Sequence, residues 1–196
     1  MLKKPALILF GGSFDPIHSA HLGIAEQALR SVEGEGRVLF IPAAQSPLKA
    51  QAAAATAAQR LAMLRLAIEH EPRFTICDWE LRRGGKSFSI DTVRHLASEY
   101  PEHEHYWLIG TDQLRQLPKW YAIEEIACLV TFLVYRREGT ADVSIPEVAD
   151  LRVAWVDGPL LPASSTAIRH DAQILNANVP KKVAAFIRQN GLYRPS

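Results

Sequence analysis

One segment near the N-terminus joins a strand-like pattern directly to a helix-like pattern. The apolar run at residues 6–10 is short and unbroken, which is typical of a strand that is buried on both faces. Gly11 and Gly12 follow it, and beyond Pro16 apolar residues recur at helical spacing. We therefore expect the strand to pass through a Gly-Gly turn into a helix, an arrangement that parallel α/β sheets repeat.

Strand-like and helix-like patterns alternate along the rest of the chain. Short apolar runs predict strands at residues 6–10, 37–41, 74–79, 106–109, 129–135 and 152–156. Helical patterns predict helices at residues 20–31, 57–70, 90–100, 123–127 and 179–190, the second of them opened by a capping box of Thr56 and Gln59. This alternation favours an α/β fold, a doubly wound parallel sheet with helices on both faces, as a single domain over residues 1–196. Ligands of such folds bind beyond the carboxyl ends of the strands, at the switch point.

Composition narrows the class of protein. Of the 196 residues, 48% are hydrophobic and 22% charged, which is ordinary for a globular protein. The net charge of +1 gives no general attraction to nucleic acid or membrane, so we expect neither as a partner. Cys77 and Cys128 lie far apart in apolar stretches, which favours buried free thiols. The apolar run that follows Lys3 and Lys4 is too short for a signal-peptide core, so a cytoplasmic protein is expected.

The segment after the first strand also predicts an anion site. A helix N-terminus offers free N–H groups and the positive end of the helix dipole. Gly11 and Gly12 carry no Cβ, so a ligand can approach the backbone closely. His18 and His21 are three residues apart and share one helix face. In an isolated H-x-x-H such residues would be surface caps, but after this strand they predict a phosphate site that contains two imidazoles.

A second candidate phosphate site lies near the other end of the chain. Ser165 and Thr166 precede a helical register, as N-caps commonly do. Arg169 follows Thr166 by three positions and Ser165 by four, which brings its guanidinium over the same helix end. Hydroxyls, free N–H groups and an arginine together favour a polyphosphate.

Both segments resemble motifs of one family. The first resembles the signature of the nucleotidylyltransferase superfamily, G-G-[ST]-F-D-P-x-H-x-G-H, in the form of nicotinate-nucleotide adenylyltransferases, with Ala20 in place of a glycine. The second resembles the family motif I-S-S-T-x-I-R, with Ala163 in place of the apolar β-branched residue. The resemblance extends from residue 8 to the C-terminus. It implies a Rossmann-like nucleotidylyltransferase fold and adenylyl transfer from ATP to nicotinate mononucleotide, yielding nicotinate adenine dinucleotide and pyrophosphate in NAD biosynthesis.

The resemblance also implies how the ATP phosphates are held. His18 and His21 would act on the α-phosphate, and Arg169 on the leaving pyrophosphate. The other residues implied at the phosphates are Gly11, Gly12, Ser13, Phe14, Lys49, Ser165 and Thr166. No residue is expected to ligate a resident metal, because Mg²⁺ would arrive with ATP, held largely by phosphates and water.

Other segments that resemble the family imply the remaining contacts. Asp112, with Gly110, would hold a nucleotide ribose, although its position after a strand is equally typical of a helix N-cap. Ser89, which local sequence alone makes a helix N-cap, would meet the carboxylate of nicotinate. Trp120 would stack on the pyridine ring beside Tyr121, although a tryptophan in such a loop is usually partly buried core. Backbone N–H groups at the start of the helix at Ser89 and around Trp120 and Tyr121 could receive the carboxylate, and no acidic side chain is expected near it, so the acid mononucleotide should be preferred over the amide.

Three alternatives remain open at this point. A related nucleotidylyltransferase, such as the phosphopantetheine enzyme, would not need the loop that carries Trp120. A metal-dependent hydrolase would use His18, His21 and Asp112, which lack a local ligand motif. A nucleotide-binding module would bind ATP without releasing pyrophosphate. Whether the chain forms a homo-oligomer is also open.

Overall fold

Six parallel strands form the sheet that carries the site. The computed structural model describes residues 4–45, 53–136, 143–161 and 164–193. The strands are β1 (Ala6–Gly12), β2 (Gly36–Pro42), β3 (Phe74–Ile76), β4 (Glu104–Gly110), β5 (Thr131–Tyr135) and β6 (Val153–Val156). They are ordered β3-β2-β1-β4-β5-β6, and each neighbouring pair is parallel. The predicted doubly wound parallel sheet is confirmed.

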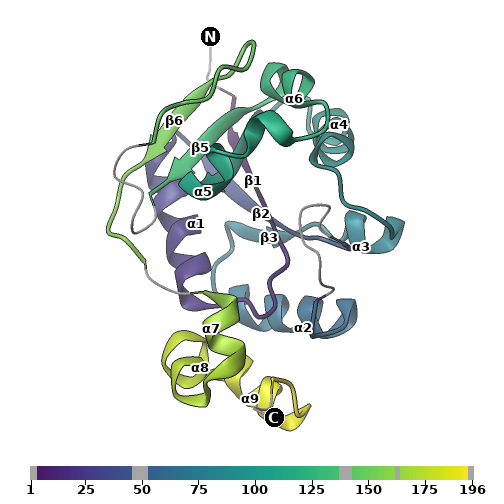
Figure 1. The fold of residues 1–196 in the computed structure, drawn as a ribbon, viewed down its shortest axis with the longest axis vertical. Coiled ribbons are helices and arrows are strands. Elements are labelled where there is room, and N and C mark those ends of the chain that lie inside the picture. The colour runs from purple at the N-terminus through teal and green to yellow at the C-terminus, as the bar shows by residue number, and fades with distance from the viewer. Residues whose placement is uncertain (1–3, 46–52, 137–142, 162–163, 194–196) are drawn as a thin grey trace.

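Helices cover both faces of this sheet (Figure 1). They are α1 (Ser19–Ser31), α2 (Ala57–Ile68), α3 (Trp79–Arg83), α4 (Ser89–Glu99), α5 (Thr111–Leu114), the 3₁₀ turn η1 (Leu117–Lys119), α6 (Ile123–Leu129), α7 (Ser165–His170), α8 (Ala172–Asn178) and α9 (Lys181–Gln189). One core cluster joins the sheet to α1, α2 and the three C-terminal helices, and the other joins it to α4, α5 and α6. Figure 1 shows α7, α8 and α9 grouped at the C-terminal end of the chain.

The first strand shows why its sequence is apolar without interruption. Ile8 and Phe10 belong to one core cluster, whereas Leu7 and Leu9 belong to the other. Successive side chains of a strand point to opposite faces, so a strand covered on both faces must be apolar throughout. The pattern at residues 6–10 therefore predicted the burial of this strand correctly.

The position of β1 in the sheet also determines where the site lies. β1 pairs with β2 on one side and with β4 on the other, so the chain reverses its direction of winding there. In an open α/β sheet, the crevice beyond the carboxyl ends of the strands at this switch point is where ligands bind. The first candidate phosphate segment begins at that point, as the sequence predicted.

Two predicted strands were too long, for local reasons. The run at residues 74–79 was predicted as one strand, but β3 ends at Ile76 and Trp79 begins α3. The charged residues that follow Trp79 are good helix formers, and none could remain in a buried strand. Leu129 was predicted to begin a strand but ends α6, because the pairing of β5 with β4 starts at Thr131.

The helix predictions hold more closely. The capping box is confirmed: Thr56 accepts from the main-chain N–H of Gln59, and the Gln59 side chain accepts from that of Thr56. The C-terminal helix begins at Lys181 rather than residue 179, and α8, capped by Asp171, was not predicted.

The burial predicted for the thiols is wrong for Cys128, which is exposed. Every helix in the described ranges is too short or too polar to cross a bilayer.

Candidate active site

The two glycines of the first motif lie in the strand, which corrects the predicted Gly-Gly turn. β1 extends through Gly12, and a Cβ on Gly12 would lie 3.0 Å from the Phe14 ring. A Cβ on Gly11 would lie 3.2 Å from Trp107. The sharp change of direction comes at Phe14, whose φ of 45° lies in the left-handed region that non-glycine residues seldom adopt. The Phe14 side chain is buried in the core, so only its main chain is placed to contact a ligand.

The two histidines lie together at the start of α1, as predicted. His18 is the N-cap of the helix and is 3% exposed. Its ring stacks on that of His21, with 3.7 Å between centroids. The main-chain N–H of His18 donates to Nδ1 of His21 at 3.3 Å. A neutral His21 ring therefore carries its proton on Nε2, which makes that atom a donor for an anion.

The second motif packs directly against the first, so the two candidate phosphate sites form one region. Arg169 donates to the main-chain oxygen of Asp15 at 2.7 Å and to the Thr166 hydroxyl at 3.2 Å. The Ser165 hydroxyl donates to the main-chain oxygen of Pro16 at 3.2 Å. The N-cap is Ser164, whose side chain accepts from the main chain three residues later, whereas Ser165 and Thr166 lie in the first turn of α7.

Two buried charges that the sequence did not reveal support this region. Asp15 is 4% exposed and accepts from the main-chain N–H groups of residues 54 and 55, and from the Tyr193 hydroxyl at 2.6 Å. The buried Arg60 donates to the main-chain oxygen of Ser13 at 2.7 Å. Burial lowers the pKa of Arg60, and the nearby Asp15 charge opposes that shift. Helix α2 and the C-terminal tail therefore both hold the loop that leads into α1.

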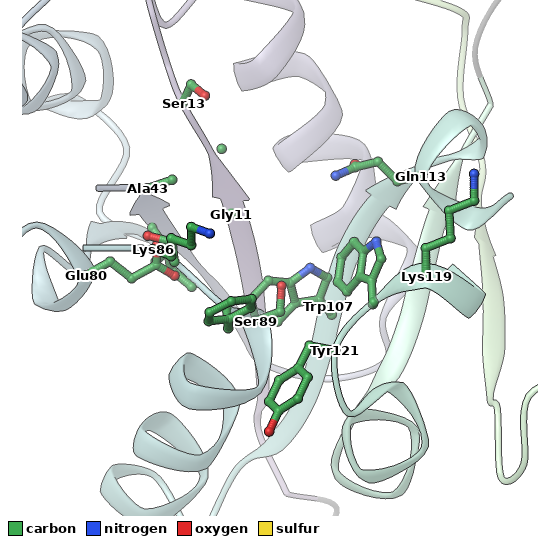
Figure 2. A pocket seen from close by; sticks show the side chains of 15 residues that line it. Gly11, Ser13, Ala43, Glu80, Lys86, Ser89, Trp107, Gln113, Lys119 and Tyr121 are labelled. Atoms are coloured by element: carbon green, nitrogen blue, oxygen red, sulfur yellow. The ribbon is translucent and has the colours of Figure 1, made fainter. Parts of the chain in front are cut away.

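A cavity of about 410 Å³ opens beside the carboxyl ends of β1, β2 and β4. It is lined by Gly11, Gly12, Ser13, Ile41, Ala43, Glu80, Lys86, Ser87, Phe88, Ser89, Trp107, Gln113, Lys119, Trp120 and Tyr121. Figure 2 shows Glu80 and Lys86 on one side of it, with Gln113 and Lys119 on the opposite side. The histidines and Arg169 do not line this cavity, whereas Gly11, Gly12 and Ser13 do, so the candidate phosphate region and the cavity meet at the end of β1.

The residues predicted for nicotinate meet in this cavity. Trp120 is packed edge-on against Trp107, with 6.3 Å between ring centroids, and its indole nitrogen is buried without a partner among the described residues. Tyr121 is 68% exposed and its ring lies 5.4 Å from that of Phe88. Ser89 is the first residue of α4 rather than its N-cap, since Phe88 occupies that position.

Asp112 lies two positions beyond the N-cap of α5, which is the place that its local sequence favoured. The N-cap of α5 is Gly110, and Asp112 lies in the first turn of the helix. A Cβ on Gly110 would collide with the Asp112 carboxylate. The aspartate side chain thus folds back against the end of β4, into the space that a side chain at position 110 would take. Gly110 and Asp112 remain adjacent at that strand end, as the predicted ribose site requires.

The cavity contains an acid that contradicts one prediction. No acidic side chain was expected near the nicotinate carboxylate, yet Glu80 lines the cavity and is 4% exposed. Burial raises the pKa of Glu80, while hydrogen bonds from Ser87 and Thr92 lower it. Lys86 lines the same wall and was not predicted either. Nothing in the local sequence indicates this burial, because Glu80 follows the predicted strand at residues 74–79 and a glutamate is expected on the surface unless partners from other segments compensate it.

Two further points concern Lys49 and the hydrolase alternative. Lys49 lies outside the described residues, so its predicted contact with a phosphate stays a prediction. The described part of the chain has no cluster of three or more His, Cys, Asp and Glu side chains able to hold a metal. His18, His21 and Asp112 thus do not form the ligand set that the hydrolase alternative needs.

Comparison with known sequences identifies the family. Residues 9–171 match the sequence model described as Cytidylyltransferase-like. A "Probable nicotinate-nucleotide adenylyltransferase" from Opitutus terrae is 41% identical over 189 residues, covering 95% of this chain and 96% of the relative. A relative with the same description from Synechococcus sp. (strain JA-3-3Ab) is 42% identical over 193 residues, covering 94% of this chain and 93% of the relative.

Comparison with solved structures agrees on the fold. Plasmodium falciparum nicotinic acid mononucleotide adenylyltransferase complexed with NaAD has a TM-score of 0.77 over 96% of this chain and 97% of that chain. The same protein complexed with APC has a TM-score of 0.76. At 18% and 16% identity these likenesses bear on the fold alone. The full-length similarity of the sequences carries the assignment further: the chain belongs to the nicotinate-nucleotide adenylyltransferase family of cytidylyltransferase-like proteins.

Proposed function

We propose that this protein transfers the adenylyl group of ATP to nicotinate mononucleotide, producing nicotinate adenine dinucleotide and pyrophosphate. The observation that carries this proposal is the contact between the two phosphate motifs, in which Arg169 donates to the main-chain oxygen of Asp15 at 2.7 Å. An aromatic-lined cavity adjoins that contact at the switch point of the sheet. A nucleotide triphosphate and a flat ring therefore both have a place beside the same strand ends.

The reaction needs positioning and charge stabilisation more than a protein nucleophile. A phosphate monoester is largely ionised at neutral pH, so an oxygen of the mononucleotide phosphate can attack the α-phosphorus of ATP directly. The bond between the α-phosphorus and the oxygen bridging to the β-phosphorus breaks, and its electron pair leaves with pyrophosphate. Catalysis then consists of holding the two phosphates in line and stabilising charge on the phosphoryl oxygens.

We assign the phosphate contacts as follows. His18 and His21 act at the α-phosphate, where a neutral His21 carries its proton on Nε2 because its Nδ1 accepts a hydrogen bond. Arg169 acts on the departing pyrophosphate, where its guanidinium can offer two parallel donors. The other residues proposed for the ATP phosphates are Gly11, Gly12, Ser13, Phe14 through its main chain, Lys49, Ser165 and Thr166.

The remaining contacts belong to the nucleosides. We assign Asp112 and Gly110 to a ribose, because both lie at the end of β4 beside the cavity residue Gln113. Trp120 and Tyr121 receive the pyridine ring, and the start of α4 at Ser89 receives its carboxylate.

ATP enters as its magnesium complex in this scheme. The described residues hold no cluster of three or more metal-ligating side chains. Phosphate oxygens and water are the ligands that Mg²⁺ commonly keeps in nucleotide sites. We therefore propose that the ion travels with its nucleotide and neutralises charge on the phosphates as pyrophosphate leaves.

One assay tests the proposal against its alternatives. The purified protein is incubated with magnesium, ATP and one acceptor: nicotinate mononucleotide, its amide analogue or phosphopantetheine. Pyrophosphate release is followed with a coupled enzyme, and the dinucleotide product is identified by mass spectrometry. Stoichiometric pyrophosphate and nicotinate adenine dinucleotide are expected with the first acceptor. Activity with phosphopantetheine alone, or ATP binding without pyrophosphate release, would refute the proposal.

A further inference from the structure

A buried acid on the cavity wall has no part in the reaction as described. Glu80 belongs to α3, lines the cavity and is 4% exposed. Its carboxylate accepts from the Thr92 hydroxyl at 2.5 Å and from the Ser87 hydroxyl. A buried carboxylate is costly unless hydrogen bonds satisfy it, so these partners account for its presence.

The partners of Glu80 belong to different segments around the cavity. Ser87 lies in the loop between α3 and α4, and its hydroxyl also accepts from the main-chain N–H of Ala44 at 3.0 Å. The main-chain N–H of Ser87 donates to the oxygen of Gln45 at 2.9 Å. Thr92 lies in the first turn of α4, three residues after Ser89. Glu80 therefore connects the segment after β2, the α3–α4 loop and the start of α4.

The charge of Glu80 makes it unsuitable as a direct contact for the substrate. Nicotinate mononucleotide carries a carboxylate and a phosphate, and a carboxylate side chain would repel both. Lys86 and Lys119 line the cavity and offset that charge, and Arg83 and Asp91 lie close enough to influence the pKa of Glu80 in opposite directions. Both named hydrogen-bond partners of Glu80, Ser87 and Thr92, are protein hydroxyls. Such bonds hold parts of the protein in place relative to one another.

We propose that Glu80 is a positioning residue for the mononucleotide: through Ser87 and Thr92 it fixes the wall that presents Phe88 and Ser89 to the pyridine ring. This inference rests on the function proposed above. Figure 2 shows Glu80 on the wall opposite Gln113 and Lys119. His18, His21 and Arg169 lie outside the cavity lining, and the segment that carries Ala44 meets the end of β1 through the main-chain hydrogen bond from Ala43 to Gly12, which does not involve the Glu80 side chain. A change at Glu80 should thus affect one substrate and spare the other.

The test compares steady-state constants for both substrates in Glu80→Ala, Glu80→Gln and Thr92→Val. Glu80→Ala should raise KM for nicotinate mononucleotide by about tenfold or more, since one net hydrogen bond is typically worth that factor, with KM for ATP within about twofold. Glu80→Gln keeps an acceptor for Thr92 and should recover most of the loss. Thr92→Val preserves volume, acts on a residue outside the cavity lining and should raise the same KM by a smaller factor.

A matched control separates this effect from a general loss of structure. Glu125 forms a surface ion pair with Arg94 that joins α4 to α6, so Glu125→Ala removes an acidic hydrogen-bond acceptor outside the cavity lining. It should leave both KM values unchanged. Quenching of tryptophan fluorescence by nicotinate mononucleotide gives an independent measure of its binding, because Trp107 and Trp120 line the cavity.

Three results would overturn the proposal. They are an unchanged mononucleotide KM in Glu80→Ala, an equal rise in both KM values, and a Glu80→Gln variant as impaired as the alanine variant. If Glu80→Ala does not fold, a Thr92→Val variant with wild-type constants overturns it instead. The wild-type protein is assayed first with both substrates. Failure of the wild-type protein to form the dinucleotide would refute the proposed function. An active wild type, together with Glu80 and Thr92 variants whose KM values match it, would refute only the role of Glu80.

Discussion

Arg169 offers the sharpest test of how the two phosphate motifs cooperate. Replacing Arg169 with alanine removes one donor to the main-chain oxygen of Asp15 and another to Thr166. In the proposed complex it also removes a charged donor to the leaving pyrophosphate. A hydrogen bond of that type contributes about 1.5–3 kcal/mol, which corresponds to roughly a 10- to 150-fold rise in KM for ATP.

The same substitution should cost some stability. The Arg169 side chain is 25% exposed, so water can replace part of its hydrogen bonding to the loop. We expect a loss of about 1 kcal/mol, which for a chain of this size lowers Tm by about 2–4 °C. Arg169→Lys should preserve more of the contact with the main-chain oxygen of Asp15 than of the proposed contact with the ATP phosphates. The reason is that one ammonium cannot reproduce the paired donors of a guanidinium.

The assay measures KM for each substrate with the other saturating, together with thermal unfolding by circular dichroism. The expected result is a large rise in KM for ATP, a mononucleotide KM within about threefold and a small decrease in Tm. An equal rise in both KM values, or a collapse of Tm with ATP binding intact in the surviving protein, would show that Arg169 only holds α7 against the loop.

Three further predictions concern other parts of the site. His18→Ala and His21→Ala should each lower kcat by about 10²–10³ with little change in ATP binding, measured by pyrophosphate release and equilibrium titration. The acid mononucleotide should exceed the amide in kcat/KM by about 10³, with Trp120→Ala lowering both and preserving their ratio. Tyr193→Phe should lower the free energy of unfolding by about 1–2 kcal/mol at neutral pH, measured by urea denaturation, since it removes the donor to Asp15. Burial and that hydrogen bond raise the pKa of Tyr193 above its usual 10, so this stabilisation is complete below pH 10 and the difference between variant and wild type should shrink above it.

The phosphate region was predictable because its determinants are local in the sequence. A buried strand, two glycines and a helix start lie within one short segment, and the stacked rings of His18 and His21 follow from helical spacing alone. Arg169 and Thr166 likewise meet because they are three residues apart on α7. What the spacing could not show is that α7 would pack on the loop after β1, since that contact joins opposite ends of the chain.

The pyridine cavity was predictable only through resemblance, because its walls come from separate strand ends. Trp120 and Ser89 lie in different segments, and nothing in their local patterns brings them together. Local sequence predicted Ser89 and Asp112 as N-caps. The N-caps are instead Phe88, one residue before Ser89, and Gly110, two residues before Asp112. Helix boundaries of this kind depend on the chain that enters the helix as much as on the capping residue.

Buried charge is where reasoning from sequence failed most clearly, and the reason is physical. A charged residue is expected on the surface unless a partner compensates it, and the partners of Asp15, Arg60 and Glu80 are largely supplied by other segments. Two of these three groups hold the loop that leads into α1, and the third holds the wall of the cavity. The buried charges thus lie behind the residues proposed to meet substrate, so a change in one of them should reveal which substrate its wall serves.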